Sequence, residues 1–167
     1  MPLLGGCFIV AYEMQLNMFT DYSLRVLIYA AIHTNRRCVT SEIAAAFHIS
    51  INHVIKVVHA LQRFGYIETV RGRSGGFKLA KPPEHIRLGD VVRDTEGSLS
   101  LVECFDQTNN TCPLTHACGL QYALMEGFDA FFAVLDRYSL ADLVSRPHWV
   151  ERVVMLNPEP GNVVRRM

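Results

Sequence analysis

The sequence predicts a mainly α-helical protein with one small β-hairpin, built as a winged helix-turn-helix that a long helix follows. Three observations support this fold class. Apolar residues recur at helical spacing in several segments, and a turn rich in glycine and arginine separates two strand-like segments between residues 66 and 80. Half of the 167 residues are apolar and 19% are charged, proportions typical of a folded globular protein.

Charge is distributed unevenly, although the formal net charge is zero. Residues 1–93 carry eleven Lys/Arg against six Asp/Glu, while residues 94–167 carry five against ten. A basic first part favours a polyanionic partner, and the acidic second part indicates that this partner does not contact it. No apolar run approaches the roughly 18 residues that span a bilayer, and the start lacks a secretory signal, so we expect a cytoplasmic protein without membrane contact.

The first helix is expected from about residue 19 to 33, with Thr20 and Asp21 in its opening turn. After a polar TNRR segment, Thr40 or Ser41 is expected to cap a short second helix. Ser50 is expected to cap a third helix, which ends at Gly65 in the position that favours a left-handed residue.

The third helix has two different faces. Its apolar stripe comprises Val54, Val58 and Leu61, and its opposite polar stripe comprises Asn52, Lys56, His59 and Arg63. Two short helices joined by a short turn, the second with a basic outer face, predict a helix-turn-helix. The segments YIETV and GFKLA then flank RGRSGG, which predicts a basic hairpin, the wing of a winged helix.

Each basic feature alone is weak evidence, because charged helix faces are usually only solvated. The order of the features decides for DNA, since a duplex carries about one charge per 1.7 Å of its axis and suits a face rich in Lys and Arg. Residues near the start of the recognition helix reach base edges, so Asn52, His53 and Lys56 are the candidates for base reading. Candidates for contact with phosphate or the minor groove are Arg63, Arg71, Arg73 and Ser74, and Ser41 and Ser50 complete the predicted DNA-binding set.

The second half begins with another short helix, RLGDVVRDTEG, and a cysteine-containing loop. A long helix is expected over residues 119–138, and Ser139 with Asp142 forms a capping box that restarts the chain as SLADLV. We therefore expect an extension outside the fold at 1–13, a DNA-binding domain at 14–93, a loop at 94–118, a dimerisation helix with the short following helix at 119–144, and a flexible tail at 145–167.

The long helix carries an apolar stripe over five turns. Its members are Leu120, Leu124, Phe128, Phe131, Leu135 and Tyr138. The stripe could form a bundle core within one chain, but residues 14–93 already have their own partners for burial. The simplest cover is the same helix of a second subunit packed about a two-fold axis, which predicts a homodimer.

The loop CFDQTNNTCPLTHAC, residues 104–118, holds Cys104, Cys112 and Cys118. Their spacing resembles neither a zinc ribbon nor the tight cysteine run of a bacterial ferredoxin. On spacing alone three interpretations stay open: free thiols, a zinc site with His116 as fourth ligand, or an iron–sulfur cluster with three thiolates and a ligand from outside the loop.

The segments MQLNMFTDYSLRVLIYAA and HVIKVVHALQRFGYIETVRGRSGGFKLAKPPEHIRLGDVVR, followed by C-x7-C-x5-C, resemble the iron–sulfur winged-helix repressors that include IscR and NsrR. The resemblance covers residues 14–144. SLSLVECF and YSLADLV make the chain most similar to the nitric-oxide-sensing NsrR group. The resemblance implies a homodimer on a palindromic DNA operator and one iron–sulfur cluster, 2Fe–2S or 4Fe–4S, per subunit.

The same resemblance implies that Cys104, Cys112 and Cys118 are cluster ligands. It implies Asp21 of the FTD motif, from the partner subunit, as the fourth ligand, with His116 as the rival. Without the resemblance Asp21 would be explained by the helix macrodipole, which favours an acid in the first turn. We expect a repressor that senses nitric oxide and is not an enzyme. The alternatives are an IscR-like sensor of cluster or iron status and a small redox protein.

Overall fold

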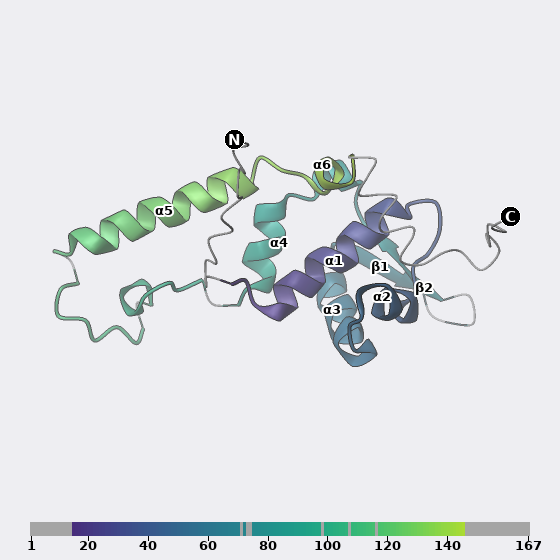
Figure 1. The fold of residues 1–167 in the computed structure, drawn as a ribbon, viewed down its shortest axis with the longest axis horizontal. Helices are drawn as coiled ribbons and strands as arrows, with labels where there is room; N and C mark the ends of the chain where they lie inside the picture. Colours follow the sequence, from purple (N-terminus) through teal and green to yellow (C-terminus); the bar gives the residue numbers. More distant parts are fainter. Residues whose placement is uncertain are drawn as a thin grey trace, which may run out of the picture.

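The structure is a computed structural model that describes residues 15–70, 72, 75–97, 99–106, 108–115 and 117–145. Most elements gather in one body, and the long helix and the cysteine loop extend to one side of it (Figure 1). The elements in order are α1 (Met18–Ile32), α2 (Thr40–Phe47), α3 (Ile51–Arg63), β1 (Ile67–Val70), β2 (Gly76–Leu79), η1 (Pro83–His85), α4 (Leu88–Thr95), η2 (Glu103–Phe105), α5 (Gly119–Leu135) and α6 (Leu140–Val144). The mainly α fold class with a two-stranded hairpin is confirmed.

Helix α1 lies at the centre of the body, where it packs against α3, α4 and α6. Its N-cap is Asn17, whose side chain accepts a hydrogen bond of 2.7 Å from the Thr20 N–H. Val26 and Leu27 are fully buried in α1, together with Tyr29. Thr20 and Asp21 stand in the first turn as expected.

The helix-turn-helix is confirmed, with a correction at the start of α2. The N-cap is Val39 rather than Thr40 or Ser41. A valine has no polar group with which to cap, so the carboxylate of Glu42 reaches back and accepts the Val39 N–H at 2.8 Å. Ser50 is the N-cap residue of α3, but its hydroxyl makes no capping bond.

The end of α3 agrees with the expectation. Gly65 has a positive φ of 76°, its N–H donates to the Gln62 carbonyl at 3.0 Å, and the Tyr66 N–H donates to the Leu61 carbonyl at 2.9 Å. This pair of bonds is a Schellman motif, which reverses the chain and starts the hairpin.

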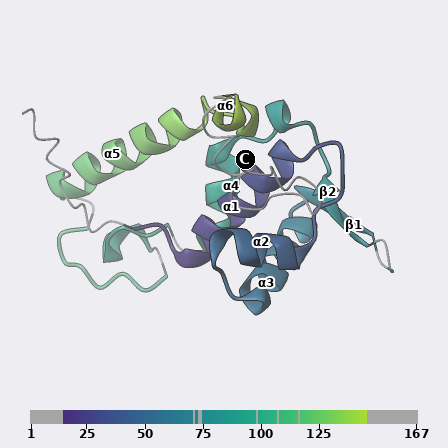
Figure 2. The same ribbon diagram turned by 45° about the vertical axis from the view of Figure 1, so that its right-hand side comes forward.

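The hairpin pairs β1 with β2 antiparallel, with Ile67 opposite Leu79 and Val70 opposite Gly76. Cys38, in the connection between α1 and α2, exchanges two backbone hydrogen bonds of 2.8 and 2.9 Å with Phe77 of β2. The hairpin is thus tied to the helix-turn-helix through Phe77, and its two strands extend outward from the body (Figure 2).

Helix α6 packs on α1 and η1, although it follows the long helix in the sequence. The Leu140 N–H donates to the Ile86 carbonyl at 2.8 Å, the Leu88 N–H donates to the Tyr138 carbonyl at 3.0 Å, and Leu140 is fully buried. The expected capping box is present, since the Asp142 carboxylate accepts the Ser139 N–H at 2.7 Å. The chain therefore leaves the body along the cysteine loop and returns to it along α5.

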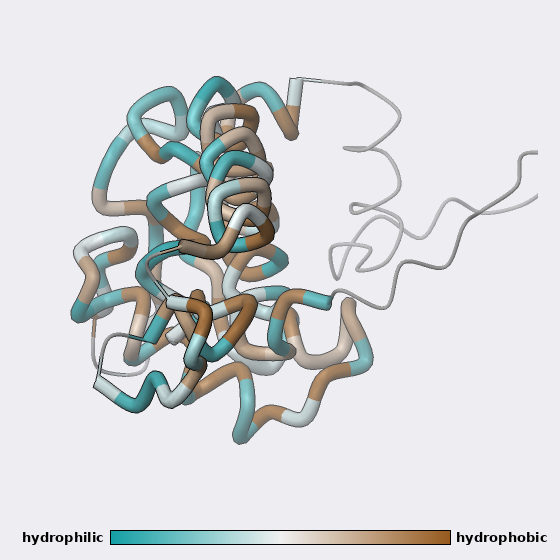
Figure 3. Tube along the Cα trace, turned by 90° about the vertical axis from the view of Figure 1, so that its left-hand side faces the viewer, coloured by the Kyte–Doolittle hydropathy of each residue, from teal (hydrophilic) through white to brown (hydrophobic). Residues whose placement is uncertain are grey.

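Figure 3 views the molecule from the side where α5 extends and colours the chain by hydropathy. Apolar positions recur along the part of the chain nearest the viewer. Exposed large apolar residues of the described chain include Leu101, Leu120 and Val134. Within the described part of the chain, no helix combines the length and the apolar character that crossing a membrane requires.

Candidate nucleic-acid interface and cysteine loop

Helix α3 presents one face to the core and the other to solvent. Its buried residues are Val54, Val57, Val58, Ala60 and Leu61, and its exposed residues include Asn52, His53, Lys56, His59 and Arg63. Both stripes expected from the sequence are therefore confirmed. The exposed face bears amide, imidazole, ammonium and guanidinium groups, which are hydrogen-bond donors suited to base edges and phosphates.

The starts of α2 and α3 are both accessible to solvent. Ser41 and Ser50 are both exposed. The Ser50 carbonyl accepts the N–H groups of His53 and Val54, at 2.9 and 3.1 Å. Because the Ser50 hydroxyl is not used for capping, it remains available to a partner molecule.

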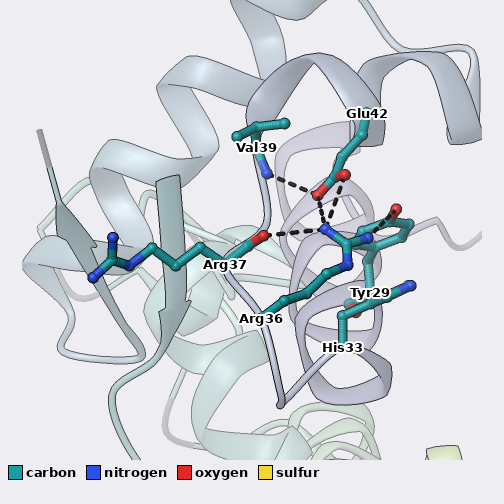
Figure 4. Close-up of polar contacts among 6 residues, drawn as sticks. All are labelled: Tyr29, His33, Arg36, Arg37, Val39 and Glu42. Carbon is teal, nitrogen blue, oxygen red and sulfur yellow. Dashed lines mark hydrogen bonds and ion pairs between the residues drawn. The ribbon is translucent and has the colours of Figure 1, made fainter. Parts of the chain in front are cut away.

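Arg36 holds the connection that leads into α2, and sequence reasoning missed it. Its Nη1 donates to both carboxylate oxygens of Glu42 at 3.0 Å and to the Arg37 carbonyl at 3.1 Å, while Nη2 donates to the Tyr29 hydroxyl at 3.3 Å (Figure 4). Burial pushes the pKa of Arg36 downward, but the bonds to Glu42 and Tyr29 outweigh burial and raise the pKa above its ordinary value. No spacing rule connects these three residues, so only the folded chain reveals the network.

The wing is described only in part. Arg71, Arg73 and Ser74 lie outside the described residues, so their role stays a prediction. Within the described strands, Lys78 forms an ion pair of 3.0 Å with Glu68 across the hairpin. Lys81 lies 5.7 Å from the centre of the Tyr66 ring.

The cysteine loop joins α4 to α5. Cys104 lies in the η2 turn, Cys118 is the N-cap residue of α5, and Cys112 stands between them. The Cys112 N–H donates to the Asn110 side chain at 3.0 Å, and the Cys104 carbonyl accepts from Gln121 of α5 at 3.4 Å. All three thiols are free and half-buried.

Acidic and hydroxyl side chains order the loop between the cysteines. Glu103 accepts the Thr111 hydroxyl at 2.6 Å, and this bond lowers the pKa of Glu103. Asp106 accepts from the Thr108 hydroxyl at 2.6 Å and from the Asn109 side chain at 2.8 Å, and these bonds lower the pKa of Asp106 to about 2.

Three thiols in one loop are the donor set that iron–sulfur clusters use, so the residues present fit such a group chemically. Across the described residues, no three His, Cys, Asp or Glu side chains are gathered closely enough to hold a metal ion. The structure therefore supplies the thiols in one segment without assembling them. The zinc alternative rests on His116, which lies outside the described residues.

Asp21 is engaged by a neighbour on its own helix. Arg25 binds its carboxylate through two nitrogens, Nη2 to Oδ2 at 2.7 Å and Nε to Oδ1 at 3.1 Å. Both side chains are more than two-fifths exposed, at 44% for Asp21 and 41% for Arg25. The carboxylate is accessible, but a metal ion would have to compete with Arg25 for it.

The apolar stripe of α5 divides into two groups. Leu124, Phe128 and Leu135 are half-buried, whereas Leu120 and Phe131 are exposed. Tyr138 is also exposed, but it lies after α5, which ends at Leu135 rather than near residue 138 as expected. Leu124 and Phe128 line a cavity of about 720 Å³ between α5, the end of α4 and residues 99–101. Among the described residues of α5 Phe132 alone is buried, so the face turned to the body includes a residue outside the expected stripe.

Comparison with known proteins finds relatives among transcriptional regulators. Residues 16–146 match the family model Rrf2, iron-dependent transcriptional regulator. The HTH-type transcriptional regulator NsrR of Geobacillus kaustophilus is 52% identical over 78% of this chain and 90% of its own length. NsrR of Bacillus subtilis is 44% identical over 86% of this chain and 99% of its own length.

A solved structure of CymR, the global cysteine regulator of B. subtilis, superposes with a TM-score of 0.63 at 26% identity, covering 79% of this chain and 97% of that one. The chain is a DNA-binding transcriptional regulator, and the expectation that it is not an enzyme is confirmed because its relatives are regulators. The matched residues, the identity to curated regulators and the shared fold agree, and the chain therefore belongs to the Rrf2 family.

Proposed function

We propose that the chain is a homodimeric repressor that binds a palindromic operator and responds to nitric oxide through an iron–sulfur cluster. The observation that carries this proposal is the loop with three free, half-buried thiols, which lies directly between α4 of the DNA-binding body and α5. Its similarity to curated NsrR regulators supports the nitric-oxide signal. Such a regulator acts where the DNA is, which we take to be the cytoplasm.

In this proposal Cys104, Cys112 and Cys118 hold a 2Fe–2S or 4Fe–4S cluster, and the partner subunit's Asp21 completes it. A bound cluster supplies iron that reacts with nitric oxide. A carboxylate is a hard donor beside three soft thiolates, so Asp21 is the ligand held least firmly. Arg25 pairs with Asp21 at 2.7 Å in the structure and gives the released carboxylate a partner.

The cost of freeing Asp21 from Arg25 is small. Exposed ion pairs of this kind contribute about 0.2–1 kcal/mol, which a metal–carboxylate bond exceeds readily. Arg25 also competes with the cluster iron for the Asp21 carboxylate, so Asp21 is a ligand that can be exchanged. Release of Asp21 would disconnect one subunit's loop from the DNA-binding body of the other, and two recognition helices would lose their half-site separation of about 34 Å.

The DNA part of the proposal places Asn52, His53 and Lys56 at base edges, and Ser41, Ser50, Arg63, Arg71, Arg73 and Ser74 at the backbone or minor groove. Asn52→Ala or Lys56→Ala should cost about 1–3 kcal/mol selectively at particular base pairs. Arg73→Ala should weaken binding to all sequences and reduce the salt slope by about one unit. Equal losses on operator and random DNA for the α3 variants would contradict the assignment of base reading.

The dimer part of the proposal uses the accessible residues of α5, two of which, Gly127 and Phe131, border the cavity that Leu124 and Phe128 also line. Gly127 has no atom within 4 Å of a built Cβ in its own subunit, and Phe131 is 37% exposed. Phe131→Glu and Gly127→Leu should therefore leave each subunit folded and yield monomers in sedimentation. Val70→Glu, at an exposed strand position, is the control and should stay dimeric. Dimeric Phe131→Glu and Gly127→Leu proteins would contradict this interface.

One observation favours a second candidate, an IscR-like sensor of cluster or iron status. Because Arg25 already binds Asp21, a fourth ligand from the loop itself, His116, is the alternative. Anaerobic purification of wild type, Asp21→Ala and His116→Ala, followed by visible spectra, separates the two ligands. The proposed function expects Asp21→Ala to alter the cluster spectrum and the nitric-oxide response. If Asp21→Ala matches wild type in both, Asp21 is not the ligand.

A further inference from the structure

Arg93 of α4 fastens the C-terminal end of α5 to the body. Arg93 binds the Asp136 carboxylate with two parallel bonds of 2.7 Å, one from each terminal nitrogen. The same guanidinium lies 4.4 Å from the centre of the Phe132 ring. Arg93 thus contacts both the Asp136 carboxylate at the C-cap of α5 and the ring of Phe132, the buried residue of that helix. Pairing through two bonds fixes orientation as well as distance.

The surface of α4 is shaped to admit Asp136. Gly89 is buried, and a Cβ built on it would lie 1.8 Å from the Asp136 Oδ1. Any other residue at position 89 would displace the carboxylate from Arg93. The close approach of α5 to α4 therefore depends on the lack of a side chain at Gly89.

A stack of aromatic rings continues from this joint to the cysteine loop. Phe132 and Phe128 have ring centres 4.9 Å apart, and Phe128 and Phe105 have ring centres 6.2 Å apart, each pair edge to face. Phe105 directly follows Cys104 in the η2 turn. The Cys104 carbonyl also accepts from Gln121 of α5, so this turn rests on α5, and α5 rests on α4 through Arg93.

We propose that Arg93 is the positioning residue that fixes α5, and through the Phe132–Phe128–Phe105 stack the Cys104 turn, on the DNA-binding body. The regulatory part of this inference rests on the proposed function. A change in the cysteine loop would alter the contact of α5 with α4 at Arg93, and α4 packs on the central helix α1. Without Arg93, α5 and the Cys104 turn would be held less firmly against the DNA-binding body.

The first test uses the full chain without a cluster and needs no DNA. Arg93→Met keeps most of the stem that covers Phe132 and removes the charge, and Asp136→Asn removes the other partner. Asp90→Asn is the matched control, because Asp90 is a more distant partner of Arg93 at 3.4 Å. Amide hydrogen exchange in α5 and residues 103–105 should become about fivefold faster in the first two variants, and α1 and α3 should be unchanged.

Gly89→Ala provides an independent test, since it displaces Asp136 without altering any charge. It should accelerate exchange in the same segments as Arg93→Met. If Arg93→Met and Asp136→Asn exchange like Asp90→Asn, the positioning role is wrong, whatever the loop binds.

The second test measures the ratio of operator affinities with and without the cluster. For wild type the proposed function expects a large ratio, and for Arg93→Met the inference expects a ratio near one with the cluster spectrum retained. A wild-type ratio of one overturns the proposed function and the regulatory role together. A large ratio that persists in Arg93→Met, with faster exchange in α5, overturns the regulatory role alone.

Discussion

Asn17 and Glu96 bind each other through both side chain and backbone. The Glu96 carboxylate accepts the Asn17 N–H at 2.9 Å, and the Asn17 side chain donates to the Glu96 carbonyl at 2.8 Å. Asn17 is the N-cap of α1, one turn before Asp21, and Glu96 is the C-cap of α4, where the cysteine loop begins. Within each subunit, the start of α1, which carries Asp21, is thus joined to the segment that leads into the cysteine loop.

Replacement of Asn17 should destabilise the fold. Asn17→Ala removes the cap on the Thr20 N–H and the bond to Glu96, and we expect a loss of about 1–2 kcal/mol in the free energy of unfolding. Urea titration of the cluster-free protein measures this loss. Gln15→Ala, at an exposed position, is the control and should change little. An Asn17→Ala protein as stable as this control would contradict the role of the cap.

Gly65→Ala tests the end of the recognition helix. The φ of 76° is strained for any residue with a Cβ, while nothing lies within 4 Å of the added atom, so the effect is one of backbone conformation alone. We expect a loss of about 1–2 kcal/mol by urea titration. Gly119→Ala has equal space at a negative-φ helix position and should lose nothing. Equal effects of the two substitutions would exclude the left-handed turn.

Cys38 should be protected from thiol reagents. It is fully buried between the helices and β2, and burial raises the pKa of its thiol from 9.0 to about 12, so it is protonated at neutral pH. In the cluster-free native protein, peptide mass spectrometry should find Cys104, Cys112 and Cys118 modified by a maleimide well before Cys38. Urea should abolish the difference. Labelling of Cys38 at the rate of Cys112 in native buffer would contradict this burial.

Acid should loosen the Asp106 turn. Hydrogen bonds from Thr108 and Asn109 lower the pKa of Asp106 from 3.8 to about 2. Because the folded pKa lies below the unfolded value, the stabilisation is complete above about pH 3.8 and is lost as the pH falls through about 2. An NMR titration of the Asp106 carboxyl should show the low midpoint. Thr108→Val should raise it, whereas Asn110→Ala should not, and a midpoint near 3.8 in wild type would contradict the bonds.

Local rules predicted the DNA-binding body well. Helical spacing located α1, α3 and α4, the glycine after α3 located its Schellman motif, and the alternating segments around RGRSGG located β1 and β2. These features depend on residues close in the sequence, where propensity and capping decide the conformation. The N-cap of α2 failed because Glu42 supplies the capping bond three residues away, at a valine that no capping preference favours.

The site depended on contacts that no local pattern reveals. Helical spacing could not show that Phe132 of α5 packs against Arg93, which lies 39 positions earlier in the chain, counted from residue 93 to 132. The return of α6 to the core and the Arg36 network likewise join distant segments. The cysteine spacing alone left free thiols, zinc and iron–sulfur open, and only the family resemblance chose among them.

The most direct test of nitric-oxide sensing is the operator affinity of anaerobically purified, cluster-containing protein before and after exposure to nitric oxide. Fluorescence anisotropy with labelled operator DNA, at fixed salt and with random DNA as the reference, gives both dissociation constants. A repressor of this kind should bind the operator tightly and specifically before exposure and lose at least about tenfold in affinity after it, which corresponds to about 1.4 kcal/mol. An operator affinity that nitric oxide leaves unchanged, in protein whose visible spectrum shows that the cluster has reacted, would contradict it.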